Sequence, residues 1–187
     1  MASFTTCSGR WHLIDQDPAP GPLPRPSLRL TGVFAAVVAI GLVIGWVVNS
    51  NDVATAEVGS PAPDFTLPLI GGGTFTLSEQ SGIVVINEWA SWCTPCRDEI
   101  PEISAFADAN PDVVVVGVAV EDTVEAATAF AGEVGATYQL AIGDATFERA
   151  YPRFGLPVTY VVDADGVVIE LFNGILTEET LQELVPG

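Results

Sequence analysis

Two cysteines, Cys93 and Cys96, lie where an apolar run gives way to a segment with helical periodicity. Residues 83–86 are typical of a strand, and apolar residues at helical spacing follow over residues 100–107. Backbone N–H groups at the start of a helix stabilise a thiolate, so Cys93 should ionise more readily than a free cysteine. Pro95 suits the first helical turn and leaves Cys96 within reach of Cys93. The pair is predicted to be a redox-active disulfide that needs no other cofactor.

The residues around this pair, WASWCTPCRDEIP at 89–101, resemble the active-site signature of the TlpA/ResA-like, membrane-anchored thiol–disulfide oxidoreductases of the thioredoxin superfamily. A bare Cys-x-x-Cys also occurs in zinc sites and by chance. Trp89, Trp92 and the Glu-x-Pro at 99–101 make the match specific. The resemblance covers residues 59–187. It implies an α/β, thioredoxin-like fold, in which helices flank a central mixed sheet and a β-hairpin precedes the core.

The resemblance also implies roles for the residues of the motif. Cys93, exposed at the helix N-terminus, would attack a disulfide as the thiolate, and the more buried Cys96 would then release the product. Glu99 matches the glutamate of the family pattern and lies on the same helix face as Cys96, so it is expected to accept the proton of Cys96. The alternative is a solvated helix glutamate. Trp92 and Pro95 are expected to contact the substrate.

A second stretch of the resemblance is GLPVT at residues 155–159. In thioredoxin-like proteins such a proline is cis and faces the cysteines, so Leu156 and Pro157 are expected to bind substrate. The alternative is a trans proline that only starts a strand. Asn87 stands where many thioredoxins have a buried aspartate, and it cannot accept a proton. Glu88 replaces an apolar residue of the family and should point to the sheet face opposite Asn87, either as a second proton acceptor or as an edge feature.

Alternating β-type and helical segments predict a parallel α/β unit followed by an antiparallel hairpin. A first hairpin is expected from residues 64–67 and 74–77, on either side of a triple glycine. The turn at 163–166 should join the last two strands. The remaining expected strands cover 83–89, 113–120, 138–142, 158–162 and 167–172, and the expected helices cover 94–109, 123–134, 145–151 and 178–185.

Four regions are predicted along the chain: a disordered, Pro-rich cytoplasmic tail (1–29), a transmembrane helix acting as signal anchor (30–50), a linker (51–58) and the thioredoxin-like domain (59–187). The anchor region is uncharged, and about 19 apolar residues span roughly 28 Å as a helix. Arg25 and Arg29 precede it, whereas acidic residues follow. The positive-inside rule therefore predicts a single-pass protein of the cell membrane, with a cytoplasmic N-terminus and an extracytoplasmic C-terminal domain.

Two further interpretations concern the same region. Residues 54–56 have the small-x-small form of a signal-peptidase site, so cleavage after Ala56 is the alternative to an uncleaved anchor. Gly41 and Gly45 fit the small-xxx-small spacing of a transmembrane dimer. Cys7, in the tail, is interpreted as an incidental thiol.

The net charge of −18, with six arginines and no lysine, argues against nucleic acid as a partner. The expected substrates are protein disulfides or thiols, including apocytochrome c, since the resembling family acts in cytochrome c maturation. Strong oxidants of the thioredoxin superfamily often carry a histidine between the cysteines, whereas the Thr-Pro found here resembles the reducing, TlpA/ResA-like members, so the resemblance implies a reductase. A single transmembrane helix cannot carry electrons across a membrane, so a multi-helix membrane electron donor is also implied. The alternatives are a disulfide-forming oxidant, a peroxiredoxin-like peroxidase and a metal-carrying thiol protein. No metal site is expected, because two thiolates leave the ligand set incomplete.

Overall fold

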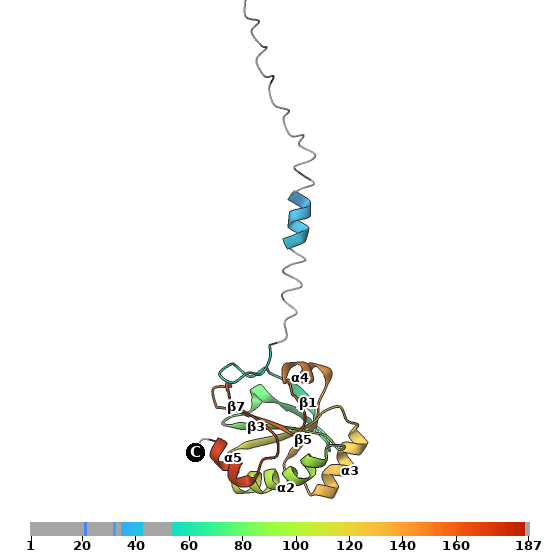
Figure 1. Cartoon of the computed structure of the whole chain (residues 1–187), viewed down its shortest axis with the longest axis vertical. Coiled ribbons are helices and arrows are strands. Elements are labelled where there is room, and N and C mark those ends of the chain that lie inside the picture. The colour runs from blue at the N-terminus through green and yellow to red at the C-terminus, as the bar shows by residue number, and fades with distance from the viewer. Residues whose placement is uncertain (1–20, 22–31, 33–34, 43–53, 186–187) are drawn as a thin grey trace, which may run out of the picture. The chain divides into compact units, whose positions relative to one another are not determined.

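Five strands form one mixed sheet in the order β5-β4-β3-β6-β7 in the computed structural model, which describes residues 21, 32, 35–42 and 54–185 (Figure 1). β3 is central, runs parallel to β4 and antiparallel to β6, and every one of its residues is buried. This is the pattern expected of a strand covered on both faces. The strands are β3 (Val84–Trp89), β4 (Val114–Ala119), β5 (Gln139–Ile142), β6 (Val158–Val162) and β7 (Val168–Asn173).

Helices cover both faces of this sheet. One face packs against α2 (Thr94–Ala109), α3 (Val124–Val134) and α5 (Glu178–Leu184), through residues such as Ile103, Phe130 and Leu181. The other face packs against α4 (Ala145–Ala150). Because side chains alternate along a strand, neighbouring residues of β3 belong to different cores: Val85 contacts the α2 side and Ile86 the α4 side.

A small antiparallel hairpin, β1 (Thr66–Pro68) and β2 (Thr74–Thr76), completes the α4 side and leads into the short 3-10 helix η1 (Leu77–Glu79). Phe65, just before β1, stacks on Phe75 and meets the rings of Phe147 and Tyr151 edge-on. Such aromatic pairs add to the stability that burial alone provides. The hairpin is therefore part of the core on the side away from α2.

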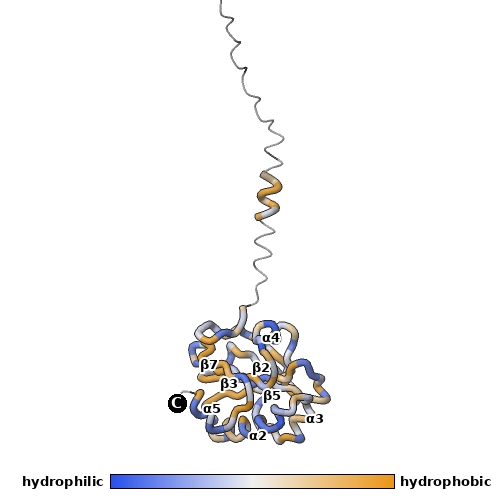
Figure 2. The backbone as a smooth tube through the Cα atoms, in the orientation of Figure 1, coloured by the Kyte–Doolittle hydropathy of each residue, from blue (hydrophilic) through white to orange (hydrophobic). Residues whose placement is uncertain are grey.

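The ends of the helices are set by local hydrogen bonds. Thr123 caps α3 through its side chain, and Gly135 ends that helix in the left-handed conformation that glycine adopts without strain. Asp144 caps α4 by accepting from two backbone N–H groups. Figure 2 shows the apolar residues running along the central strands, as burial on both faces requires.

The chain enters the core at Ala56. This residue is 1% exposed, belongs to the α4-side core, and donates its backbone N–H to the carbonyl of Ala150 at 2.7 Å. Residue 56 is thus already part of the folded unit, although the predicted linker extended to residue 58.

The predicted thioredoxin-like fold with its mixed sheet and preceding hairpin is confirmed, and most elements begin and end within one or two residues of their expected bounds. The predicted tail and most of the predicted transmembrane helix lie outside the described residues. Residues 35–42 are helical and expose apolar side chains, among them Leu42. Within the described part of the chain, no helix is long and apolar enough to cross a membrane.

Candidate active site

The two cysteines of the motif form a disulfide at the junction of β3 and α2. Cys93 is the N-cap of α2 and Cys96 lies in its first turn, with their Cα atoms 5.4 Å apart. The backbone N–H of Cys96 points at the Cys93 sulfur, 3.2 Å away. The same N–H group would stabilise a thiolate on Cys93 in the reduced protein.

The prediction that Cys93 is exposed is wrong for this oxidised form. The side chain of Cys93 is only 4% exposed and that of Cys96 is fully buried, so the expected order of burial holds but the difference is small. The reason is packing: both cysteines belong to an apolar cluster with Trp89, Ala90 and Ile100, and Leu156 packs against this cluster.

Glu99 is buried below the disulfide, one helical turn after Cys96. Its two carboxylate oxygens accept hydrogen bonds from the Asn87 side-chain amide at 3.0 Å and from the backbone N–H of Leu176 at 3.1 Å. Burial raises the pKa of Glu99 to about 7, although both hydrogen bonds lower it. A carboxyl group with this pKa changes its protonation state near neutral pH, which suits a proton acceptor.

Glu88 faces away from this site, as the alternation along β3 predicted. It is fully buried on the α4 side, where one carboxylate oxygen pairs with the guanidinium of Arg153 at 3.2 Å. Burial raises the pKa of Glu88 to about 8, while the charge of Arg153 lowers it. The structure therefore brings Glu88 to Arg153, and it brings Glu99 to Asn87 and the α2 side of the sheet.

The loop between β3 and Cys93 is held by the turn that follows β4. The Ser91 hydroxyl and backbone N–H both donate to the carboxylate of Asp122. The indole N–H of Trp92 donates to the carbonyl of Glu121 at 3.1 Å, while 59% of the Trp92 side-chain surface stays exposed. Trp92 thus stands at the surface beside the disulfide.

The peptide bond between Leu156 and Pro157 is cis, as the resemblance implied. Pro157 is buried at the start of β6, and Leu156 packs against the cluster that contains both cysteines. Pro95 lies exposed in the first turn of α2. Of the expected substrate contacts, Trp92 directly precedes Cys93 in the chain, and Leu156 packs against the cluster that contains both cysteines.

Known proteins match this chain in sequence and in structure. Residues 58–171 match the model of the AhpC/TSA family. The chain belongs to the AhpC/TSA family. It is 29% identical over 157 residues to the thiol:disulfide interchange protein DsbE of Pseudomonas aeruginosa, a match that covers 81% of this chain and 86% of the relative. It is 29% identical to the thiol-disulfide oxidoreductase ResA of Geobacillus kaustophilus, over 82% of this chain and 92% of the relative.

The fold also matches solved structures. The crystal structure of a thioredoxin-family thiol:disulfide interchange protein from Chlorobium tepidum superposes with a TM-score of 0.63 at 25% identity, covering 71% of this chain and 97% of that one. Within the AhpC/TSA family, this protein is thus a TlpA/ResA-like thiol–disulfide oxidoreductase with Cys93 and Cys96 as its redox pair.

Sequence reasoning singled out most residues that surround the disulfide in this AhpC/TSA-family protein, but it missed three of their partners. Asn87 was considered only as a failed proton acceptor, whereas its amide hydrogen-bonds Glu99 and the Thr159 hydroxyl. Arg153 and Glu121 were not singled out. A buried glutamate in a β strand signals a cationic partner, and that signal could have led from Glu88 to one of the few arginines.

Replacing Asn87 with alanine is expected to move the pH dependence of thiol–disulfide exchange upward. The substitution removes a donor that favours the ionised form of Glu99, so the pKa of Glu99 should rise by about one unit, as the loss of a hydrogen bond to a charged group predicts. The measurement is the single-turnover rate of the reduced protein with a disulfide peptide across pH. Asn110→Ala, at the other end of α2, is the matched control. An unchanged midpoint for Asn87→Ala would contradict the assignment.

Proposed function

We propose that this protein is an extracytoplasmic reductase of protein disulfides, with a role in cytochrome c maturation or related thiol delivery. The observation that carries the proposal is the buried Glu99 carboxyl, which lies one helical turn after Cys96 and whose pKa burial raises to about 7. Relatives named DsbE and ResA support the same reading.

The proposed reaction transfers two electrons from the dithiol to the substrate. The Cys93 thiolate attacks a substrate disulfide, forms a mixed disulfide and releases one substrate thiolate. Cys96 then gives its proton to ionised Glu99 and attacks the Cys93 sulfur, which closes the Cys93–Cys96 disulfide and releases the second substrate thiolate. A membrane electron donor of the multi-helix thiol-reductase kind would reduce the disulfide again. Trp92, Pro95, Leu156 and Pro157 would contact the substrate.

Glu88 does not act as a proton acceptor in the proposed reaction. It lies on the other face of β3 and its carboxylate pairs with Arg153, so it has no route to the Cys96 sulfur in this arrangement.

We also propose that the chain stays attached to the cell membrane by an uncleaved helix at residues 30–50, with the N-terminus cytoplasmic. Cleavage after Ala56 would remove a residue that is 1% exposed in the core, together with its hydrogen bond to Ala150. That loss speaks against the cleaved alternative. Pairing of two copies through Gly41 and Gly45 and apocytochrome c as substrate are further parts of the proposal.

The reduction potential of the Cys93–Cys96 couple tests the proposed direction of electron flow. We expect a potential more negative than about −220 mV, the upper end of the cytosolic glutathione range, as a reductase requires. The protein is equilibrated with dithiothreitol or glutathione buffers, and free thiols are counted by alkylation and gel shift. Cys7→Ser provides the control for the third cysteine.

Other values of the potential would select other functions. A potential near −120 mV, that of strong oxidants, would make the protein a disulfide-forming oxidant instead. Rapid turnover of hydrogen peroxide without any disulfide substrate would favour the peroxidase alternative. Tight binding of a metal by the reduced protein would favour the metal carrier.

A further inference from the structure

Glu121 has an unusual backbone conformation directly after β4. Its φ of 50° is the one positive φ outside glycine in the described part of the chain. A non-glycine residue in this region is strained and persists only where its surroundings hold it. Such residues concentrate at functional sites, so the contacts of Glu121 call for an explanation.

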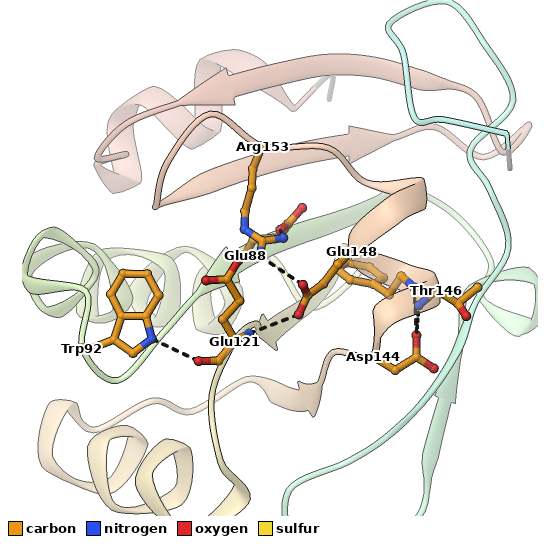
Figure 3. Close-up of polar contacts among 8 residues, drawn as sticks. Glu88, Trp92, Glu121, Asp144, Thr146, Glu148 and Arg153 are labelled. Atoms are coloured by element: carbon orange, nitrogen blue, oxygen red, sulfur yellow. Dashed lines mark hydrogen bonds and ion pairs between the residues drawn. The ribbon is translucent and has the colours of Figure 1, made fainter.

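Three different groups of Glu121 are fixed by three different residues (Figure 3). Its backbone N–H donates to the Glu148 carboxylate at 3.2 Å, and its own carboxylate accepts from the Arg153 guanidinium at 2.7 Å. Its carbonyl accepts from the indole of Trp92 at 3.1 Å. Glu121 therefore connects a charged cluster on one side to Trp92 on the other.

The charged cluster is anchored in the core. The Arg153 side chain is only 11% exposed, and it pairs with fully buried Glu88 at 3.2 Å and with Glu148 at 3.3 Å. Exposed ion pairs are usually weak because both side chains are free to move. Here the guanidinium is already held in place by Glu88, so the carboxylate of Glu121 binds to a fixed point.

Trp92 forms a wall of a groove beside the redox pair. The groove has a volume of about 480 Å³, and Glu121, Arg153 and Leu156 also line it. Trp92 directly precedes Cys93, and Leu156 packs against the cluster that contains Cys93 and Cys96, so two residues that line the groove are close neighbours of the redox pair. An extended peptide that brings its own disulfide to Cys93 would lie along this wall.

We propose that Glu121 is a positioning residue: fixed by Arg153 and Glu148, it holds Trp92 as a wall of the groove and so controls the binding of the peptide that flanks a substrate disulfide. The inference goes beyond the proposed function, because it concerns recognition of the polypeptide and holds for either direction of electron transfer. It predicts that loss of Glu121 affects peptide disulfides more than small ones.

The test compares Glu121→Gly with the wild-type full chain. Glycine keeps the left-handed backbone without strain but removes the carboxylate that Arg153 holds. The reduced proteins react with a short peptide cyclised by one disulfide and, separately, with 2-hydroxyethyl disulfide. We expect the half-saturating peptide concentration to rise about tenfold, and the limiting rate to fall by no more than about threefold, as loss of roughly one interaction implies. The ratio of peptide to small-disulfide rate constants should fall by about the same tenfold.

Further variants separate positioning from stability and from charge. Glu121→Gln keeps a carbonyl oxygen for Arg153 and is expected to stay within about threefold of wild type. Trp92→Phe keeps an aromatic wall but loses the indole N–H, so it should reproduce the loss seen with Glu121→Gly. Glu133→Gln removes an exposed carboxylate paired with Arg97, away from the groove, and is the matched control for charge.

The position of Trp92 is read directly by fluorine NMR on protein labelled with 5-fluorotryptophan. The Trp92 resonance is assigned by its loss in Trp92→Phe, and it should shift in Glu121→Gly but not in Glu133→Gln. Wild-type peptide kinetics in Glu121→Gly would overturn the proposal, with or without a shifted resonance. An equal loss in Glu133→Gln would also overturn it, because general charge rather than position would then set the affinity.

Discussion

Replacing Cys96 with serine is expected to trap the protein as a mixed disulfide through Cys93, and to lower multiple turnover by about 100-fold or more, as loss of an essential covalent group does. Cys93 caps α2 and receives the N–H of residue 96, so its thiolate should still form in the variant. Without the Cys96 sulfur nothing attacks Cys93 from within, and the substrate stays bound.

The trapped species can be measured by mass spectrometry after reaction with a single-disulfide peptide, in a background that carries Cys7→Ser. Cys93→Ser is the matched comparison and should give no adduct. An adduct of similar yield through Cys96 in Cys93→Ser would reverse the assigned roles. Because both sulfurs are buried in the oxidised form, this experiment decides between them more directly than exposure does.

Replacing Glu99 with glutamine is expected to slow closure of the Cys93–Cys96 disulfide by about 100-fold at pH 8, within the usual range for loss of a general base. In wild type, Glu99 must be ionised to accept the proton, so the rate should rise with pH through about 7, the pKa of Glu99. In the variant, the rate should instead follow ionisation of the Cys96 thiol itself. Single-turnover rates measured across pH report both changes.

Glu99→Gln should also change how the stability of the folded protein depends on pH. Because the pKa of Glu99 is raised from 4.5 to about 7, the folded protein holds a proton there that the unfolded chain has lost. Stability should therefore fall as pH rises from about 4.5 to about 7 and then level off, by up to about 3 kcal/mol for this group. Glu99→Gln should lack this loss, which denaturant unfolding at pH 5 and pH 8 would show.

Asp98→Asn, on the exposed side of the same helical turn, is the control for both readouts. Glu88 titrates in the same direction as Glu99, so the difference between wild type and Glu99→Gln, rather than the wild-type curve alone, isolates Glu99. An unchanged rate in Glu99→Gln with the expected stability change would leave Glu99 buried at the site but without the role of proton acceptor.

Much of the site could be predicted because its chemistry is local in sequence. Cys93 is the N-cap of α2, and Cys96 and Glu99 follow at three-residue intervals along the same helix, so their spacing fixes how they face each other. The strand before them and the proline at 157 follow equally local patterns. The five-stranded sheet was predictable for a related reason: runs of apolar residues such as 113–120 need cover on both faces.

The contacts that could not be predicted from the sequence join segments that lie far apart along the chain. Glu88 and Arg153 are 65 residues apart, and only the folded sheet shows that the loop before β6 crosses the end of β3. Glu121 contacts Trp92 from 29 residues away, through a carbonyl that any residue would offer. The burial of Cys93 also depends on such contacts, because Leu156, which packs against the cluster that contains both cysteines, comes from the loop before β6.

The alternation of side chains along β3 links the evolution of the two sites on either face of this strand. Asn87 donates a hydrogen bond to Glu99 on one face, and the next residue, Glu88, accepts one from Arg153 on the other. An insertion or deletion of one residue within this strand would exchange the two faces, and with them both neighbourhoods at once. The Glu99 site and the charged cluster around Arg153 should therefore be gained or lost through point substitutions, one face at a time, while the length of β3 stays fixed among descendants of this chain.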